Sequence, residues 1–198
     1  MTFDAIKMPD TPACATALEV ATAYCSPALL NHSIRAYVWA AAYGTEQGID
    51  FDPELLYVAA MFHDIALMPE FDSHTVGFDN ASGHVAWVFA AGAGWPQARR
   101  QRLVEAVVAH MLDEVDVTAD PEGFLLERST SLDISGRYMD DFSDAFKAEV
   151  LEAYPRLGIA EEFLGCFRDQ AERKPESSAA AAIRNDIAQR ILTNALDA

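Results

Sequence analysis

The sequence carries, at positions 55–64, the run Leu55-Leu56-Tyr57-Val58-Ala59-Ala60-Met61-Phe62-His63-Asp64. Its first eight residues are apolar and indicate a helix that is buried in the protein. The imidazole and the carboxylate that follow are costly to remove from water unless another group compensates them. A divalent cation compensates both at once. The run therefore predicts a metal site at the end of a buried helix.

The composition is that of one acidic, globular domain. With 198 residues, of which 51% are hydrophobic, the chain can bury one substantial core but not two. A net charge of −17 argues against a nucleic-acid partner, because phosphate binding requires clustered lysine and arginine. We expect a small-molecule substrate instead, and the sequence leaves open whether copies of the chain form a homo-oligomer.

The N-terminal residues and the cysteines indicate a cytoplasmic protein. Positions 1–10 include Asp4, Lys7 and Asp10 and lack the basic-then-apolar order of a signal peptide. No apolar run approaches the roughly 18–20 residues that cross a bilayer, so no membrane partner is expected. The three cysteines show no CxxC spacing, which indicates reduced, structural thiols.

Helical periodicity dominates the chain, and no sustained alternation of apolar and polar residues indicates a strand. Ser26-Pro27 and Asp52-Pro53 each combine an N-cap residue with proline at the first helical position. Gly48 ends the first of these two helices. We predict an all-α, single-domain helical bundle. Its parts are an N-terminal segment with a short helix (1–25), a metal-binding helical domain (26–171), and a linker with a C-terminal helix that packs on the same domain (172–198).

Other segments are predicted from their composition. Residues 68–80 contain Pro69, Gly77 and several polar side chains and indicate a loop over the helix ends. The polar stretch 172–178 contains Pro175 and indicates a linker to a terminal helix over 179–196. The remaining helices are expected near 14–25, 82–92, 96–111, 123–134 and 144–154.

Three more metal-compatible side chains lie on apolar segments. His32 lies on an apolar helix face, His110 ends the apolar run 104–109, and Asp133 stands between a leucine and an isoleucine. Taken singly, each is more often a hydrogen-bonded core residue or a helix cap than a metal ligand. Together with His63 and Asp64, they would leave several unpaired polar groups in one bundle, which a metal site explains better than core filling.

Five motifs stand in order along roughly residues 25–175. They are Asn31-His32-Ser33-x-Arg35, Phe62-His63-Asp64-Ile65, Phe78-Asp79-Asn80-Ala81-Ser82-Gly83, Val108-Ala109-His110 and Asp133-Ile134-Ser135-Gly136. This set resembles the HD superfamily of metal-dependent hydrolases, and within it the cyanamide hydratase-like branch. The resemblance implies a helical bundle of the HD-domain type.

The chain departs from the patterns of this superfamily at three places. Ala66 stands where the branch usually has glycine, and Leu67-Met68 occupies the stretch where many phosphohydrolases of the superfamily carry a lysine. Phe78 stands where binuclear members place a histidine, which favours one metal ion over two. His84 is the residue that would support a second ion, and His74 is expected to be solvated or part of a lid.

The resemblance implies a ligand set and roles for its neighbours. The metal ligands would be His32, His63, Asp64 and Asp133, which suit Zn²⁺ as the first expectation and Fe²⁺ or Mn²⁺ as alternatives. Asp64 would also orient a water molecule, and His110 would transfer a proton, as histidine does readily near neutral pH. Arg35 lies one helical turn from His32. It would either reach the same pocket as a catalytic group or pair with a nearby acid.

The function implied by the resemblance is a metal-dependent hydrolase or hydratase. Water activated by the metal would add to a small nitrile-like substrate, as in the conversion of cyanamide to urea. Trp39, Phe62, Phe78 and Trp87 would suit a small, weakly charged substrate, or would belong to the plain core. Two alternatives stay open: an HD-type phosphohydrolase acting on a nucleotide or a small phosphate ester, and a non-catalytic, metal-containing protein that binds a small molecule.

Overall fold

The computed structural model describes residues 2–197, and these residues form ten α-helices and no strand. None of the described helices combines the length and the apolar character that a bilayer span requires. The helices are α1 (Pro12–Tyr24), α2 (Pro27–Gln47), α3 (Pro53–Phe62), α4 (Phe78–Gly92), α5 (Gln97–Ala109), α6 (Pro121–Ser135), α7 (Asp144–Ala153), α8 (Ile159–Arg173), α9 (Ser178–Arg184) and α10 (Ile187–Leu192). The all-α prediction is confirmed.

Four helices begin with the same N-terminal capping pattern. In each, a polar side chain at the N-cap accepts a hydrogen bond from a backbone N–H three residues later, and proline occupies the next position. The N-cap residues are Thr11, Ser26, Asp52 and Asp120. These caps satisfy donors that the first turn of a helix leaves free. Two of the four starts were predicted from the sequence, and the cap and proline of α1 and α6 were overlooked.

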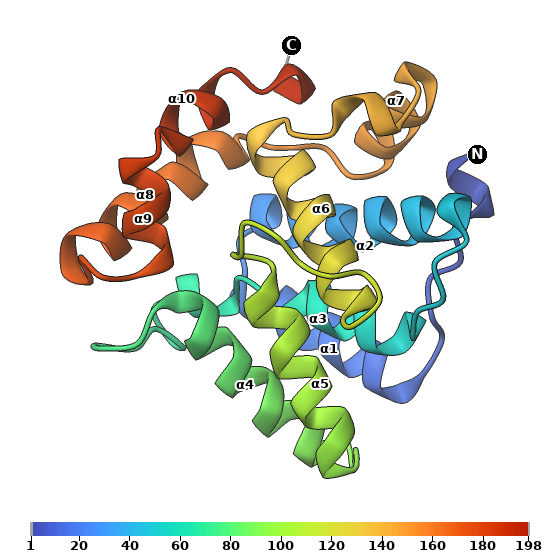
Figure 1. Ribbon diagram of the computed structural model, residues 1–198, viewed down its shortest axis with the longest axis horizontal. Coiled ribbons are helices and arrows are strands. Elements are labelled where there is room, and N and C mark those ends of the chain that lie inside the picture. Colours follow the sequence, from blue (N-terminus) through green and yellow to red (C-terminus); the bar gives the residue numbers. More distant parts are fainter. Residues whose placement is uncertain (1, 198) are drawn as a thin grey trace.

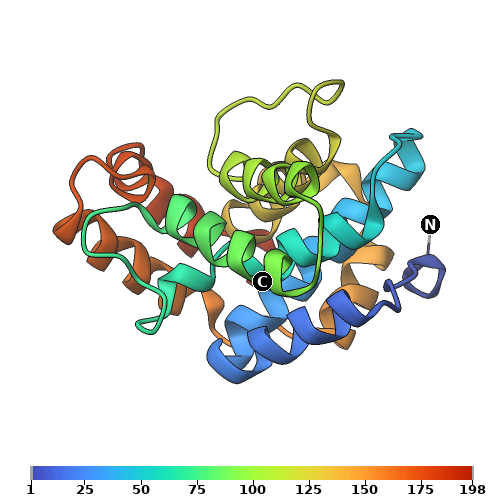
Figure 2. The same cartoon turned by 90° about the horizontal axis from the view of Figure 1, so that it is seen from below.

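Helix α2 is the centre of the bundle (Figure 1). It contacts α3 and α6, while α4 and α5 lie side by side and cover α3 (Figures 1 and 2). Helices α8, α9 and α10 pack on one another near the N-terminal end of α2, where Ser26 bonds to Glu162 of α8. Helix α10 also contacts α6. Three clusters of buried apolar side chains fill the spaces between these groups of helices. In this arrangement the first turns of α2 and the C-terminal ends of α3, α5 and α6 lie close together inside the bundle. These ends carry the histidines and aspartates that the sequence predicts as site residues.

The structure differs from the sequence prediction in three segments. Helix α4 begins at Phe78, inside the stretch predicted as a loop. Helix α8 was not predicted, although Ile159, Phe163 and Phe167 give it a buried stripe at helical spacing. The terminal helix predicted over 179–196 is broken into α9 and α10, because Asp186 has a left-handed backbone conformation with φ 57°. Local composition did not reveal this break.

The C-terminal segment is fastened to α6 by polar contacts. The Asn194 side-chain amide and the Arg156 guanidinium both donate to the backbone carbonyl of Asp133. Arg156 also pairs with Asp197. These bonds satisfy a carbonyl group near the C-terminal end of α6. They join the end of the chain to the helix that carries one of the predicted site residues.

Gly44 lies where α2 approaches α6 closely. A Cβ atom at this position would lie 2.8 Å from Phe51 Cε1 and 3.0 Å from Leu125 Cδ1. We expect Gly44→Ala to lower the free energy of unfolding by about 1–3 kcal/mol, because the added methyl group overpacks the core. Gly165, in the middle of α8, has open space around its Cα. The matched control Gly165→Ala should raise the same quantity by about 0.5–1 kcal/mol in urea unfolding. Equal effects of the two variants would contradict this account of the packing.

Candidate metal centre

Two histidines stand at the C-terminal ends of two helices that point to the same place. His63 follows the last residue of α3, and His110 follows the last residue of α5. Nδ1–H of His63 donates to the carbonyl of Ala60 at 2.8 Å, and Nδ1–H of His110 donates to the carbonyl of Val107. These carbonyls belong to last helical turns, which lack intrahelical partners. Each bond leaves the Nε2 atom with a free lone pair, and the helix C-termini favour a positive charge nearby.

A third imidazole comes from α2. Nδ1–H of His32 donates to Oδ2 of Asp133 at 2.7 Å, so its Nε2 also presents a lone pair. Burial lowers the pKa of His32, but the neighbouring carboxylates of Asp133 and Asp64 outweigh that effect and raise the pKa overall. Burial lowers the pKa of His63 and keeps this imidazole in the neutral form that binds metals. His63 therefore offers a neutral nitrogen ligand, while the carboxylates beside His32 favour the positive charge that a bound cation would bring.

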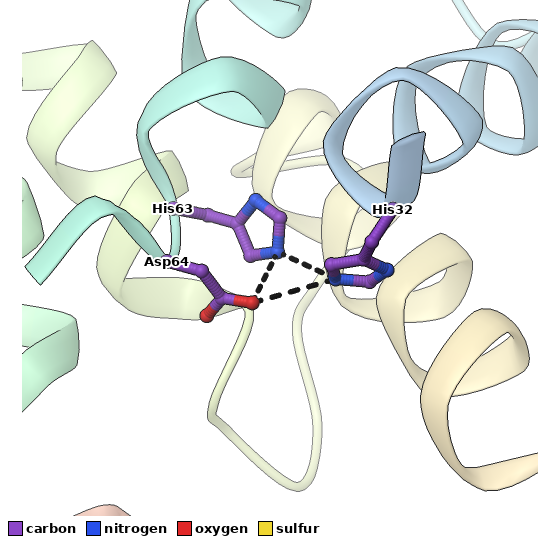
Figure 3. A group of neighbouring side chains, drawn as sticks. All are labelled: His32, His63 and Asp64. Atoms are coloured by element: carbon purple, nitrogen blue, oxygen red, sulfur yellow. Dashed lines mark hydrogen bonds and ion pairs between the residues drawn. The ribbon is translucent and has the colours of Figure 1, made fainter. Parts of the chain in front are cut away.

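His32, His63 and Asp64 bring three electron-rich atoms together (Figure 3). The two Nε2 atoms lie 3.0 Å apart, and Oδ2 of Asp64 lies 3.1 Å from that of His63 and 3.4 Å from that of His32. Ligand bonds of about 2.0–2.2 Å at octahedral or tetrahedral angles place ligand atoms roughly 2.9–3.6 Å apart. The observed separations match this range, so the three residues fit a divalent cation.

Unpaired buried atoms give a second indication of a cation site. Both carboxylate oxygens of Asp64 and Nε2 of His110 are enclosed and accept or donate no hydrogen bond within the described residues. Nε2 of His110 lies 3.6 Å from Oδ1 of Asp64. Burial works to raise the pKa of Asp64, but the surrounding imidazoles hold it well below its usual value, so the carboxylate is charged. A buried, charged and unpaired carboxylate is expensive unless a cation binds it.

Asp133 does not face this group, although the sequence predicted it as the fourth ligand. It lies beyond the ring of His32, and its two oxygens also accept bonds from Arg35 and from Nε1 of Trp39. Burial works to raise the pKa of Asp133, but Arg35 and His32 hold it well below its usual value. In this arrangement Asp133 orients a ligand and fixes its tautomer, as acids commonly do behind metal-bound histidines.

Arg35 does not reach the site, which corrects the prediction that it is catalytic. Its guanidinium makes two parallel bonds to Asp133, at 2.8 and 2.7 Å, and donates to the backbone carbonyls of Tyr154 and Pro155. Both members of the pair are fully buried. Of the two roles that the sequence left open, the structure gives Arg35 the ion pair with an acid. The residue is a positioning residue for Asp133 and, through it, for His32.

A cavity of about 220 Å³ opens from the metal centre. Its inner end is formed by His32, His63, Asp64 and His110, and its walls come from α6 and from α8–α10. Residues overlooked in the sequence include the polar side chains Glu127, Thr130, Ser131 and Ser178 and the aromatic rings of Phe163 and Phe167. The polar residues of α6 recur at the spacing of one helix face, which is the signal that sequence analysis could have used.

The other candidates lie away from this cavity. Trp39, Phe62, Phe78 and Trp87 do not line it, and the first three are buried in the core. His74 and His84 are exposed, and neither belongs to the one group of potential metal ligands found among residues 2–197. The structure therefore gives no support to a second ion at His84.

Replacement of His63 should abolish metal binding. Zn²⁺ added to the purified wild-type protein is expected to raise its melting temperature, because an ion that binds the folded state at 100 times its Kd stabilises it by about 2.7 kcal/mol. His63→Ala should lose the bound metal and this response. The control His84→Ala should keep both. The metal content of each protein is measured by mass spectrometry. Equal metal content in His63→Ala and the wild type would rule out the site.

Loss of Arg35 should destabilise the fold directly. Arg35→Leu leaves the charge of Asp133 buried without its partner, so we expect the free energy of unfolding to fall by about 3–5 kcal/mol. The exposed Arg168 forms no ion pair among the described residues. Arg168→Leu is therefore the matched control and should change stability by less than about 0.5 kcal/mol. Similar unfolding curves for the two variants would show that the buried pair has no such role.

Comparison with known proteins agrees with this geometry. The HD domain family matches residues 29–143, which include all four residues at the inner end of the cavity. Two proteins of Saccharomyces cerevisiae, the cyanamide hydratases DDI2 and DDI3, are each 27% identical to the chain over 179 residues, which cover 84% of this chain and 75% of each relative. These similarities support a metal-dependent hydrolase or hydratase. The chain belongs to the HD domain family.

Proposed function

We propose that the protein is a hydratase that adds water to a small, uncharged nitrile of the cyanamide type. The site would use one divalent cation held by His32, His63 and Asp64, with Asp133 fixing the orientation of His32. The observation that carries this proposal is the set of unpaired, buried polar atoms on Asp64 and His110 at the inner end of a small cavity. The similarity to two cyanamide hydratases supports it.

The protein side chains have separate tasks in this reaction. A divalent cation, when bound, supplies Lewis acidity and lowers the pKa of water. Asp64 has a second oxygen, Oδ1, on the side of His110, and this oxygen would accept a hydrogen bond from the attacking water and orient it. Nε2 of His110 would exchange a proton with the substrate nitrogen, since Nδ1 is held by the Val107 carbonyl.

The proposed step balances in atoms and electrons. The water oxygen forms a bond to the nitrile carbon, and one of the two C–N π bonds breaks. Its electron pair moves to the nitrogen, which takes up the first proton of the water, passed on by Nε2 of His110. The remaining O–H proton then moves to the same nitrogen while the second C–N π bond breaks and a C–O π bond forms, which gives the amide. Cyanamide becomes urea in this way, and no oxidant or reductant is required.

The charges around the cavity favour an uncharged substrate over a phosphate ester. Three carboxylates, those of Asp64, Asp113 and Glu127, line it. Its two arginines are Arg137, which pairs with Glu127, and Arg190, which is exposed and donates to the backbone carbonyl of Asn185. In a protein with a net charge of −17, this arrangement offers little attraction for an anion. Hydrolysis of phosphate esters is therefore the second candidate.

The proposal predicts urea formation from cyanamide by the metal-loaded protein. His110→Ala should keep the bound metal and lower kcat by roughly 100-fold or more, because general acid–base catalysis contributes factors of this size. His74, which is exposed and outside the cavity, provides the control, and His74→Ala should retain wild-type turnover. Urea release is measured by a coupled ammonia assay with urease.

Three outcomes would argue against the proposal. Phosphate release from a nucleotide panel, with no urea from cyanamide, would favour the phosphohydrolase. A rise in melting temperature with a small molecule and no turnover of either substrate class would favour a binding protein. A kcat of His110→Ala equal to that of the wild type would show that His110 does not carry the proton transfer.

A further inference from the structure

The cavity contains a carboxylate that the proposed reaction does not use. Glu127 lies on α6 and faces the cavity together with Thr130, Ser131 and Ile134. This spacing of three, four and seven residues places them on one face of the helix. Asp133, on a different face of α6, contacts Arg35 instead. Glu127 is only 5% exposed, so its environment is the protein interior and the cavity.

The two oxygens of Glu127 have different surroundings. Oε1 accepts a hydrogen bond from Oγ of Ser131 at 2.9 Å and another from Nη1 of Arg137 at 3.2 Å. Oε2 receives no hydrogen bond from any residue in the range 2–197, and it is not among the fully enclosed polar atoms. The carboxylate of this cavity-lining residue is thus held by one oxygen, and the other oxygen is free to accept a further hydrogen bond.

Oε2 of Glu127 can therefore accept a hydrogen bond from a donor group of the substrate. Burial raises the pKa of Glu127, although Ser131 and Arg137 act in the opposite direction. A buried carboxylate with only one oxygen satisfied gains from a further donor. The N–H group of a cyanamide is a strong donor, because the adjacent cyano group withdraws electrons from the nitrogen.

We propose that Oε2 of Glu127 accepts a hydrogen bond from the amino group of the substrate and thereby selects nitriles that carry an N–H group. This inference rests on the proposed function and adds a specificity-determining residue to it. The substrate would lie with its amino group at Glu127 and its cyano group toward His110 and Asp64, at the inner end of the same cavity. Nitriles without N–H would lack this contact and be bound less well.

The test compares Glu127→Gln with the wild type. The glutamine oxygen can still accept from Ser131 and Arg137, which directs its NH₂ group to the place of Oε2 and turns the acceptor into a donor. KM for cyanamide should rise by roughly 10- to 100-fold, the range expected for one hydrogen bond to a charged group, with a smaller change in kcat. Dimethylcyanamide, which has no N–H, should show the same inhibition constant against both proteins within about twofold.

The exposed Glu105 provides the control for the loss of one negative charge. Glu105→Gln should leave the KM for cyanamide and the inhibition constant of dimethylcyanamide at the wild-type values. An unchanged KM for cyanamide in Glu127→Gln would overturn the inference. An equal loss of affinity for cyanamide and dimethylcyanamide would also overturn it, since that result indicates a structural role for Glu127.

Calorimetric titration of cyanamide into the metal-loaded proteins separates this inference from the proposed function. If the wild type binds cyanamide but forms no urea, the proposed function fails. The ratio of Kd values for Glu127→Gln and the wild type then decides the inference, with at least a tenfold increase supporting it and a smaller one overturning it. A wild-type protein that neither binds nor converts cyanamide overturns both.

Discussion

The structure depends on three electron-rich atoms that meet in the buried interior, with no lysine or arginine among them. Nε2 of His32, Nε2 of His63 and Oδ2 of Asp64 lie within 3.4 Å of one another. The guanidinium of Arg35, on the same helix as His32, pairs with Asp133 instead. Mutual repulsion and lost hydration make such a group unfavourable unless a cation occupies it. A cation bound by this group would therefore couple metal binding to folding stability.

The bundle holds these atoms in place mainly through backbone groups that helices leave free at their ends. The carbonyls of Ala60 and Val107 fix the rings of His63 and His110. The third ring, that of His32, is fixed by a carboxylate that is itself held by a buried arginine. Because each imidazole is oriented through Nδ1, each presents Nε2 to the same space. A site built in this way needs little rearrangement to accept an ion.

The two ends of the cavity have different origins in the chain. The inner end, formed by His32, His63, Asp64 and His110, lies within residues 29–143, which match the HD domain family. Helices α8, α9 and α10 lie outside this match and supply the opposite wall. Phe163 and Phe167 from α8 add apolar surface there. The cavity thus combines residues inside the family match with residues outside it.

The sequence by itself determined the helical class and the starts of α2 and α3, because caps are local features. Its motifs proposed His32, His63 and Asp64 as ligands, but they included Asp133, which the structure places behind His32. The sequence did not reveal the break at Asp186 or the helix α8. Only the tertiary structure decided which face of α6 meets which neighbour. Glu127 and Asp133 stand six residues apart and thus on different faces of a helix with about 3.6 residues per turn. Packing against α2 turned Asp133 toward Arg35 and left Glu127 in the cavity, and spacing alone carries no information on that choice.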